Sequence, residues 1–432
     1  MKNSTLRDAI GGDAPERIDF QELKDSVHRR LLERLGSKLY TGDIEPNQLE
    51  ELVYESVSEE IDLSERSISN LTRANLVQEV VDEVLGIGPI QQLLRNSRVT
   101  EIMVNQFDKI YYEEEGRLHR SNLAYSSEEH LRRTIERIVA NVGRRIDESS
   151  PLVDARLPDG SRVNAVVPPI SIDGATLTIR KFAAEPFSTS DLIDFGTLTD
   201  ESTEFLNACV QARLNILISG GTGSGKTTTL SVLSSLIPED ERIITVEDAA
   251  ELRLNQPHVI RLESRPVNIE GEGLVSVRDL VRNALRMRPD RIVVGEVRDG
   301  AALDMLQAMN TGHDGSLTTL HANSPKDALI RLENLVLMAG IDIPLRAIRE
   351  QIVEAIDLII HQARMRDGSR RIVNISEITG IDQESIQLQE IFRFSTSAGS
   401  VPSSIGSLVP TGLPLNRRIK FELRDVALPK GR

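Results

Sequence analysis

Residues 220–227 read GGTGSGKT, and this stretch decides the fold of the region around it. It satisfies the pattern G-x-x-x-x-G-K-[ST], in which a glycine-rich loop leads directly into a helix. The residues before it, NILIS at 215–219, form the kind of apolar run that is typical of a buried strand. The residues after it, 226–237, favour a helix. A strand, this loop and a helix in that order predict a phosphate-binding loop, or P-loop.

The chemistry of phosphate binding explains the residue types in the loop. Its glycines, including Gly220, allow backbone N–H groups to curve around an anion, and the start of the next helix adds partial positive charge. The Lys226 ammonium can reach the β- and γ-phosphates of a nucleotide, and the Thr227 hydroxyl can bind Mg²⁺. The predicted nucleotide contacts are Gly221, Thr222, Gly223, Ser224, Gly225, Lys226, Thr227 and Thr228.

Outward from the loop, strand and helix patterns alternate, which is typical of a parallel sheet covered by helices. The expected strands are 215–219, 242–247, 291–296, 315–321 and 357–362. The expected helices between them include 226–237, 274–287 and 300–311. Upstream, a helix and several meandering strands end at Phe182, so the sequence predicts a smaller α+β domain before the α/β domain.

The chain has 432 residues, which is enough for two or three domains. We expect a helical N-terminal extension with a mobile tail at 1–65 and the α+β domain at 66–182. A linker with a proline and a run of Ser and Thr is expected at 183–198. The α/β domain then occupies 199–394. The region 395–432 is rich in Ser, Gly and Pro at its start, and we expect a flexible tail there.

Acidic residues end two of the predicted strands, at the sheet edge where ligands bind in open α/β folds. Glu247 ends RIITVE, with Asp248 after it, and Glu296 ends RIVVGE. Nucleotide hydrolysis needs one carboxylate that holds or hydrates Mg²⁺ and one that orients the attacking water. We expect Glu247 and Glu296 to provide these two groups. Asp248 fits a helix cap or a solvated loop equally well.

His321 ends a further predicted strand, GSLTTLH, and Asn323, Ser324 and Pro325 then interrupt the run. Taken alone, a histidine at a strand end fits a hydrogen-bonded packing residue better than a reactive group. The motifs elsewhere in the chain change that interpretation.

The composition argues against several classes of protein. Hydrophobic residues make up 39% and charged residues 27%, as in soluble globular proteins. The net charge of −15 and the 3% content of aromatic residues argue against a nucleic-acid-binding surface. The N-terminus lacks the apolar core of a signal peptide, and no run approaches the ~20 apolar residues that cross a bilayer. We therefore expect a cytoplasmic protein without a membrane span.

Four stretches point together to one family. They are GGTGSGKTTTL, TVEDAAEL, LRMRPDRIVVGEVRDGAALDMLQAMNTGHDGSLTTLHANSP and, upstream, RRIDESSPLVDARLPDGSRVNAVVPP. They resemble the ATPases of the type II/type IV secretion superfamily, and most closely the CpaF-like (TadA-type) motors of tight-adherence, or Flp, pili. The nucleotide-site motifs follow the family's order of Walker A, Asp box, Walker B and His box. The resemblance runs from about residue 70 to 394.

The resemblance implies a RecA-like domain that hydrolyses ATP to ADP and phosphate with Mg²⁺. Glu247, in the Asp box, would position or activate water. Glu296, in Walker B, would hold the magnesium–water shell together with Thr227. His321, in the His box, would contact the γ-phosphate region and report its loss, and His313 belongs to the same pattern with a less defined role.

The resemblance also implies that the N-terminal domain closes over the nucleotide and supplies arginines. Arg162 and Arg180 are the stronger candidates, and Arg156 fits a surface residue as well as a functional one. Arg298, just past Glu296, is a weaker candidate for cleft or subunit contacts. Asp299 stands where many relatives have glycine.

The family assembles as hexameric rings, so the resemblance implies a homohexamer that docks on an inner-membrane platform protein and drives pilin subunits into a filament. Three alternatives stay open. One is a VirB11-like motor for type IV secretion or conjugation, another is a nucleotide-dependent switch with little turnover, and the last is a DNA helicase or recombinase on the same core fold. The net charge and the scarcity of aromatic residues count against the last.

Overall fold

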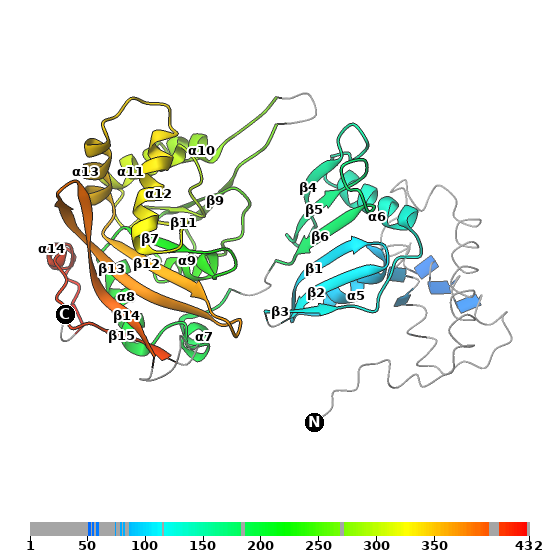
Figure 1. Ribbon diagram of the computed structural model, residues 1–432, viewed down its shortest axis with the longest axis horizontal. Helices are drawn as coiled ribbons and strands as arrows, with labels where there is room; N and C mark the ends of the chain where they lie inside the picture. The colour runs from blue at the N-terminus through cyan, green and yellow to red at the C-terminus, as the bar shows by residue number, and fades with distance from the viewer. Residues whose placement is uncertain are drawn as a thin grey trace. The chain divides into compact units, whose positions relative to one another are not determined.

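The computed structural model describes residues 86–114, 116–182, 186–267, 272–396 and 406–429, with a few helical residues between 51 and 82. The chain forms two compact units, Met1–Phe182 and Ala183–Arg432 (Figure 1). The helical extension expected at 1–65 lies almost entirely outside the described residues. None of the described helices has the length and apolar character needed to cross a lipid bilayer.

The first unit is built on a six-stranded antiparallel sheet with the order β3-β2-β1-β6-β5-β4. Its strands are β1 (Val99–Gln106), β2 (Lys109–Glu114), β3 (Arg117–Arg120), β4 (Leu152–Arg156), β5 (Arg162–Val166) and β6 (Thr176–Arg180). Buried and exposed residues alternate along β5 and β6, because successive side chains of a strand point to opposite faces. Val163 and Ile179 are buried, whereas Asn164 and Arg180 are exposed.

Helix α6 (Glu128–Ala140) covers the apolar face of this sheet. It begins after Ser127, whose side chain accepts a hydrogen bond from the His130 N–H and caps the helix. Leu131 and Ile135 of α6 share one core with Ile102 of the sheet. Two short helices precede β1, namely η1 (Gly88–Ile90) and α5 (Gln91–Arg95).

The second unit is built on a nine-stranded sheet with the order β15-β14-β13-β12-β7-β11-β10-β8-β9. Its strands are β7 (Ile216–Gly220), β8 (Ile243–Glu247), β9 (Val259–Glu263), β10 (Arg291–Val294), β11 (Leu317–His321), β12 (Leu358–Arg364), β13 (Arg370–Asp382), β14 (Ser385–Thr396) and β15 (Gly406–Pro410). The strands from β12 to β9 in this order pair in parallel, and β13, β14 and β15 extend the sheet antiparallel.

Helices cover both faces of the second sheet (Figure 1). They are α7 (Thr189–Asp194), α8 (Asp200–Gln211), α9 (Lys226–Ser234), α10 (Val277–Ala284), α11 (Ala301–Asn310), α12 (Pro325–Leu337), α13 (Leu345–Ala355) and α14 (Arg418–Glu422). Ile216 and Ile218 of β7 pack with α8 and α9, and Leu217 between them packs in a second core with α10 to α13. This arrangement confirms the predicted fold class, a RecA-like α/β domain preceded by a smaller α+β unit.

The flexible tail expected after Ser395 needs correction for the residues that the structure describes. Strand β15 pairs with β14, and Leu415 and Phe421 are buried in the core of the second unit. The Lys420 ammonium donates to the fully buried Asp357 at 2.7 Å and to Asp314 at 2.9 Å. A few apolar anchors and these ion pairs fix a segment whose composition alone favours disorder.

Candidate active site

The P-loop connects β7 to α9 and encloses the ammonium group of Lys226. Gly225 precedes the helix with a φ of 97°, in the left-handed region that favours glycine. A Cβ at this position would lie 2.9 Å from the Gln362 side-chain nitrogen, so a side chain here would displace the Gln362 amide. Lys226 is only 7% exposed, and its Nζ donates to the Gly221 carbonyl at 2.9 Å.

Lys226, His321 and Glu296 meet beside the P-loop. His321 is the last residue of β11 and pairs in register with Gly220, the last residue of β7. The Lys226 Nζ lies 3.3 Å from His321 Nδ1, and His321 Nε2 lies 3.2 Å from Glu296 Oε1. The Lys226 Nζ also lies 3.5 Å from His321 Nε2, so the ammonium faces both ring nitrogens, and its charge favours a neutral imidazole. Burial and the Lys226 charge lower the pKa of His321, which also favours the neutral ring.

Glu296 lies two residues beyond β10, which ends at Val294, so its expected place at the strand end needs correction. The chain leaves the sheet at Gly295, whose carbonyl accepts a hydrogen bond from the Thr319 hydroxyl at 2.7 Å. Arg298 then joins two acids: its Nη2 lies 2.9 Å from Glu296 Oε2 and its Nη1 lies 3.3 Å from Asp248 Oδ2. The hydrogen bond to Glu296 raises the pKa of the Arg298 guanidinium.

Glu247 contacts a different part of the chain from His321 and Glu296. It is the last residue of β8 and is 3% exposed. Its Oε2 accepts backbone N–H groups from Glu251 at 2.7 Å and Leu252 at 2.9 Å, and so orders the loop after β8. Its Oε1 is buried and has no hydrogen-bond partner in the described part of the chain. Burial raises the pKa of Glu247 above its ordinary value.

The predicted arginines lie in the first unit, in one row across its sheet. Arg156 pairs with Arg162 between β4 and β5, and Arg162 pairs with Arg180 between β5 and β6. Arg180 also pairs with Glu101 of β1, with its Nε 3.8 Å from Oε1. Directly opposed residues project from the same face of a sheet, and like charges in such positions destabilise it. The row continues through Glu101 to Glu113 of β2, so three arginines at one end of it are followed by two acids on the same face of the sheet.

Comparison with known proteins identifies the family. The family model "Type II/IV secretion system protein" matches residues 83–390, well over half of the chain. The chain belongs to this family.

Two curated relatives are similar to this chain over about two thirds of its length, and one solved structure is reported beside them. A putative conjugal transfer protein of Mycobacterium tuberculosis is 39% identical over 300 residues, which cover 68% of this chain and 85% of that protein. The type IV secretion system protein VirB11 of Bartonella henselae is 34% identical over 332 residues, with coverage of 67% and 91%. The crystal structure of the VirB11 ATPase from the Brucella suis type IV secretion system, in complex with sulphate, is 29% identical with a TM-score of 0.37 and covers 67% of this chain and 95% of that one.

Sequence reasoning missed two residues that contact the P-loop of this family member from the hairpin of β12 and β13. The Thr229 hydroxyl of α9 donates to Gln362 Oε1 at 2.8 Å. Arg370 Nε donates to the Gly223 carbonyl at 3.1 Å. No sequence signal marks either residue, because their position depends on β12 pairing directly with β7 across more than a hundred residues of chain.

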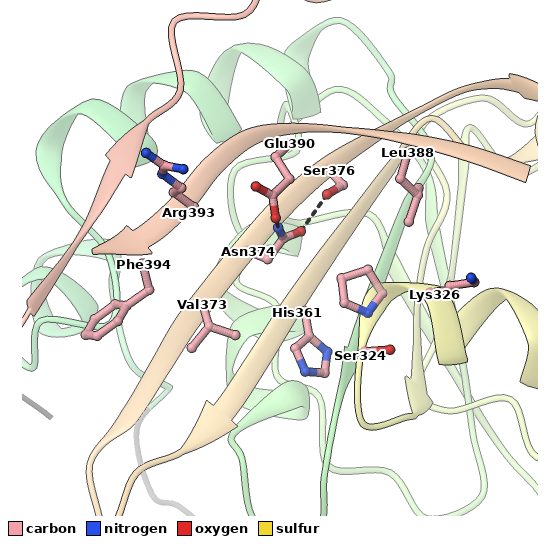
Figure 2. Close-up of a pocket in the computed structure, with 11 residues that line it drawn as sticks. Ser324, Lys326, His361, Val373, Asn374, Ser376, Leu388, Glu390, Arg393 and Phe394 are labelled. Carbon is pink, nitrogen blue, oxygen red and sulfur yellow. Dashed lines mark hydrogen bonds between the residues drawn. The ribbon is translucent and has the colours of Figure 1, made fainter. Parts of the chain in front are cut away.

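A cavity of about 520 Å³ lies over β12, β13 and β14 near the start of α12 (Figure 2). Within it, Asn374 is hydrogen-bonded to both Ser376 and Glu390. His361 also lines the cavity, and its Nδ1 lies 2.9 Å from the hydroxyl of Ser219, next to the P-loop. None of the residues that line this cavity belongs to the P-loop, so it is separate from the predicted nucleotide site.

Proposed function

We propose that this member of the secretion-system family is a cytoplasmic ATPase that acts as a homohexamer and couples ATP hydrolysis to assembly of tight-adherence pili or related type II secretion at the inner membrane. The observation that carries the proposal is the junction of Lys226, His321 and Glu296 beside the P-loop. A lysine, a neutral imidazole and a carboxylate at one sheet edge are suited to a group whose negative charge changes during turnover.

The residues present fit a magnesium nucleotide. Residues 221–228 would bind the phosphates through backbone N–H groups and the Lys226 ammonium, which would exchange the Gly221 carbonyl for a phosphate oxygen. Thr227 and Glu296 offer the oxygen donors that Mg²⁺ prefers and would hold it, partly through water. When bound, Mg²⁺ neutralises the charge that develops on the transferred phosphoryl group.

Glu247 would position the attacking water. Its buried Oε1 lacks a protein partner, and a buried polar atom of this kind commonly bonds an ordered water. A carboxyl whose pKa is raised by burial is also a better base near neutral pH. The two backbone N–H groups on Oε2 would hold the carboxylate in one orientation during the reaction.

Arg162 and Arg180 of the first unit, with Arg156 beside them, would supply positive charge to the nucleotide. The cross-strand row supports this role, because it brings three guanidinium groups together at neighbouring positions of one sheet face. Movement of the first unit with nucleotide state would then become mechanical work on a platform protein in the membrane. The net charge of −15 suits a partner with basic cytoplasmic loops.

A second candidate is a motor for type IV secretion or conjugation. It is favoured by the names of two relatives, the putative conjugal transfer protein of Mycobacterium tuberculosis and VirB11 of Bartonella henselae. The two candidates share the same chemistry at the P-loop and differ in the assembly that receives the work.

The deciding experiment introduces Lys226→Ala at the native locus, with Lys326→Ala, an exposed lysine on α12, as the matched control. We expect purified Lys226→Ala protein to lose ATP hydrolysis and the cells to lose surface filaments in electron micrographs at unchanged protein level. Filaments that persist while conjugative transfer or protein secretion stops would move the assignment to the second candidate. Hydrolysis equal to wild type in Lys226→Ala would refute the ATPase mechanism itself.

A further inference from the structure

The hairpin formed by β12 and β13 runs along the outside of the P-loop and contacts it at two levels. Where the loop enters α9, Gln362 accepts a hydrogen bond from the Thr229 hydroxyl at 2.8 Å, and its side-chain nitrogen lies against Gly225. In the middle of the loop, Arg370 Nε donates a hydrogen bond to the Gly223 carbonyl at 3.1 Å. The P-loop is therefore held from its outer side by a hairpin that follows it by more than 130 residues.

The contact at Gly223 has a consequence for phosphate binding. In a trans peptide unit the C=O and the next N–H point in opposite directions. The Ser224 N–H of this peptide unit donates to the Gly221 carbonyl at 3.4 Å, the same oxygen that accepts Lys226 Nζ, so a guanidinium that holds the Gly223 carbonyl also fixes the direction of an N–H that would serve a bound phosphate. Arg370 can thus orient a phosphate-binding donor without contacting the nucleotide.

Arg370 and its neighbour Arg371 in β13 also hold residues 195–197, which lie between α7 and α8. The Thr197 hydroxyl, on a residue only 3% exposed, donates to the Arg370 carbonyl at 2.7 Å. Arg371 Nη1 donates to the Phe195 carbonyl at 2.7 Å. Gly196 lies between them with a φ of 69°, and a Cβ there would overlap the Arg371 guanidinium. The backbone of 195–197 is therefore fitted closely to the start of β13.

We infer that Arg370 is a positioning residue that sets the donor geometry of the P-loop and couples that geometry to the segment 195–197. Its side chain bonds the loop and its carbonyl bonds Thr197, so a shift at either end displaces the other. This inference rests on the proposed function, because it takes a nucleotide as the ligand of the loop. Through Arg370, the binding of a nucleotide at the P-loop would affect the backbone of 195–197, which follows the first unit in the sequence.

The test uses the full chain, a fluorescent ADP analogue with Mg²⁺, and amide hydrogen exchange. Arg370→Ala removes the bond to the loop, and Thr197→Val removes the hydroxyl at the far end of the link while keeping the shape of the side chain. The matched controls are Arg366→Ala, an exposed arginine at the turn of the same hairpin, and Thr203→Val, a residue of α8 whose hydroxyl has no hydrogen-bond partner among the described residues.

We expect Arg370→Ala to weaken nucleotide binding about tenfold, as the loss of a hydrogen bond to a charged group does, and Thr197→Val to weaken it about threefold. In the wild type, nucleotide should slow amide exchange at 195–197, and Arg370→Ala should abolish that response while both controls keep it. The effect of Thr197→Val separates coupling from local support, because Thr197 contacts the hairpin and not the P-loop.

Wild-type affinity in Arg370→Ala would overturn the positioning role. The coupling would be overturned if Thr197→Val bound nucleotide with wild-type affinity and if nucleotide left amide exchange at 195–197 of the wild type unchanged. Either result leaves the proposed function standing if the wild type hydrolyses ATP. Conversely, a wild type that shows the exchange response without hydrolysis would contradict the proposed function and support the link.

Discussion

The Nζ atom of Lys226 lies 3.3 Å from Nδ1 of His321, so the P-loop lysine and the last residue of β11 face each other directly. A cation at this distance disfavours a second positive charge on the ring. The charge of the imidazole therefore depends on where the lysine lies. An anion that drew the ammonium away from the ring would make protonation of His321 easier.

Lys226→Ala should raise the pKa of His321, measured by NMR titration of the imidazole. The pKa should remain below the ordinary value of about 6.5, because burial is the larger cause of the shift and persists in the variant. A lowered folded-state pKa means that the folded chain binds fewer protons than the unfolded chain as the pH falls below about 6.5, so acidification costs stability there. Lys226→Ala should weaken that pH dependence. An unchanged pKa for His321, with Lys326→Ala as the reference, would contradict the arrangement.

Glu247→Gln should make the protein more stable at neutral pH and less active. The raised pKa of Glu247 means that ionisation costs stability as the pH rises from about 4.5 through the folded value. Removing the buried charge should raise Tm by about 2–4 °C at pH 8, the effect of about 1 kcal/mol in a domain of this size, and by less at pH 4. The value of kcat should fall by about 10²-fold or more. The control Glu239→Gln, at an exposed position, should change neither Tm nor kcat. A kcat of Glu247→Gln equal to that of the wild type would show that Glu247 has no part in the mechanism.

Arg162→Gln should lower kcat without lowering thermal stability. The substitution relieves the repulsion between Arg162 and its cross-strand neighbours Arg156 and Arg180, so Tm at low salt should stay level or rise. An arginine that stabilises the transition-state charge contributes about 10³–10⁵ in rate, and a loss of that size is expected. Arg133→Gln on the exposed side of α6 provides the control. A drop in Tm with unchanged kcat would show that the row serves only the fold.

Lys420→Met should destabilise the second unit by about 2 kcal/mol in urea unfolding. Asp357 is fully buried and would lose a partner at 2.7 Å, although the Asn215 N–H at 2.8 Å and the Arg417 guanidinium at 3.4 Å would remain. Breaking a buried ion pair costs about 3–5 kcal/mol when no other partner remains, so a smaller loss is expected here. The double variant with Asp357→Asn should recover part of the loss. A midpoint equal to that of Lys326→Met would show that the Lys420 ion pair contributes nothing to stability and that the other contacts of the C-terminal segment hold it, among them the bonds from Asn416 and Arg417 to Glu377.

The sequence predicted the elements around the P-loop to within a few residues. NILIS at 215–219 corresponds to β7 (Ile216–Gly220), because an apolar run followed by glycines permits little besides a buried strand. The position of His321 at the end of β11 was also predictable, since Asn323 and Pro325 stop the strand. Both features depend on local sequence alone.

Features that depend on strand order were not predictable in this way. Gln362 and Arg370 contact the P-loop only because β12 pairs with β7, and no local pattern encodes that pairing. Glu296 was placed on a strand because RIVVGE reads as one run, whereas the chain leaves the sheet at Gly295. In the C-terminal segment, Leu415 and Phe421 are too sparse to outweigh the surrounding Ser, Gly and Pro.

The bond between Lys420 and Asp357 also sets an order of events during protein synthesis. Lys420 follows Asp357 by 63 residues, so at 5–20 residues per second it leaves the ribosome roughly 3–13 s later. For that interval Asp357 lacks this cation, and within it the edge of β14 lacks β15 from the synthesis of Thr396 until that of Gly406–Pro410. A nascent chain in this state presents an open sheet edge that invites pairing with other chains. Chaperones that recognise such edges therefore have a defined period in which to act on this protein.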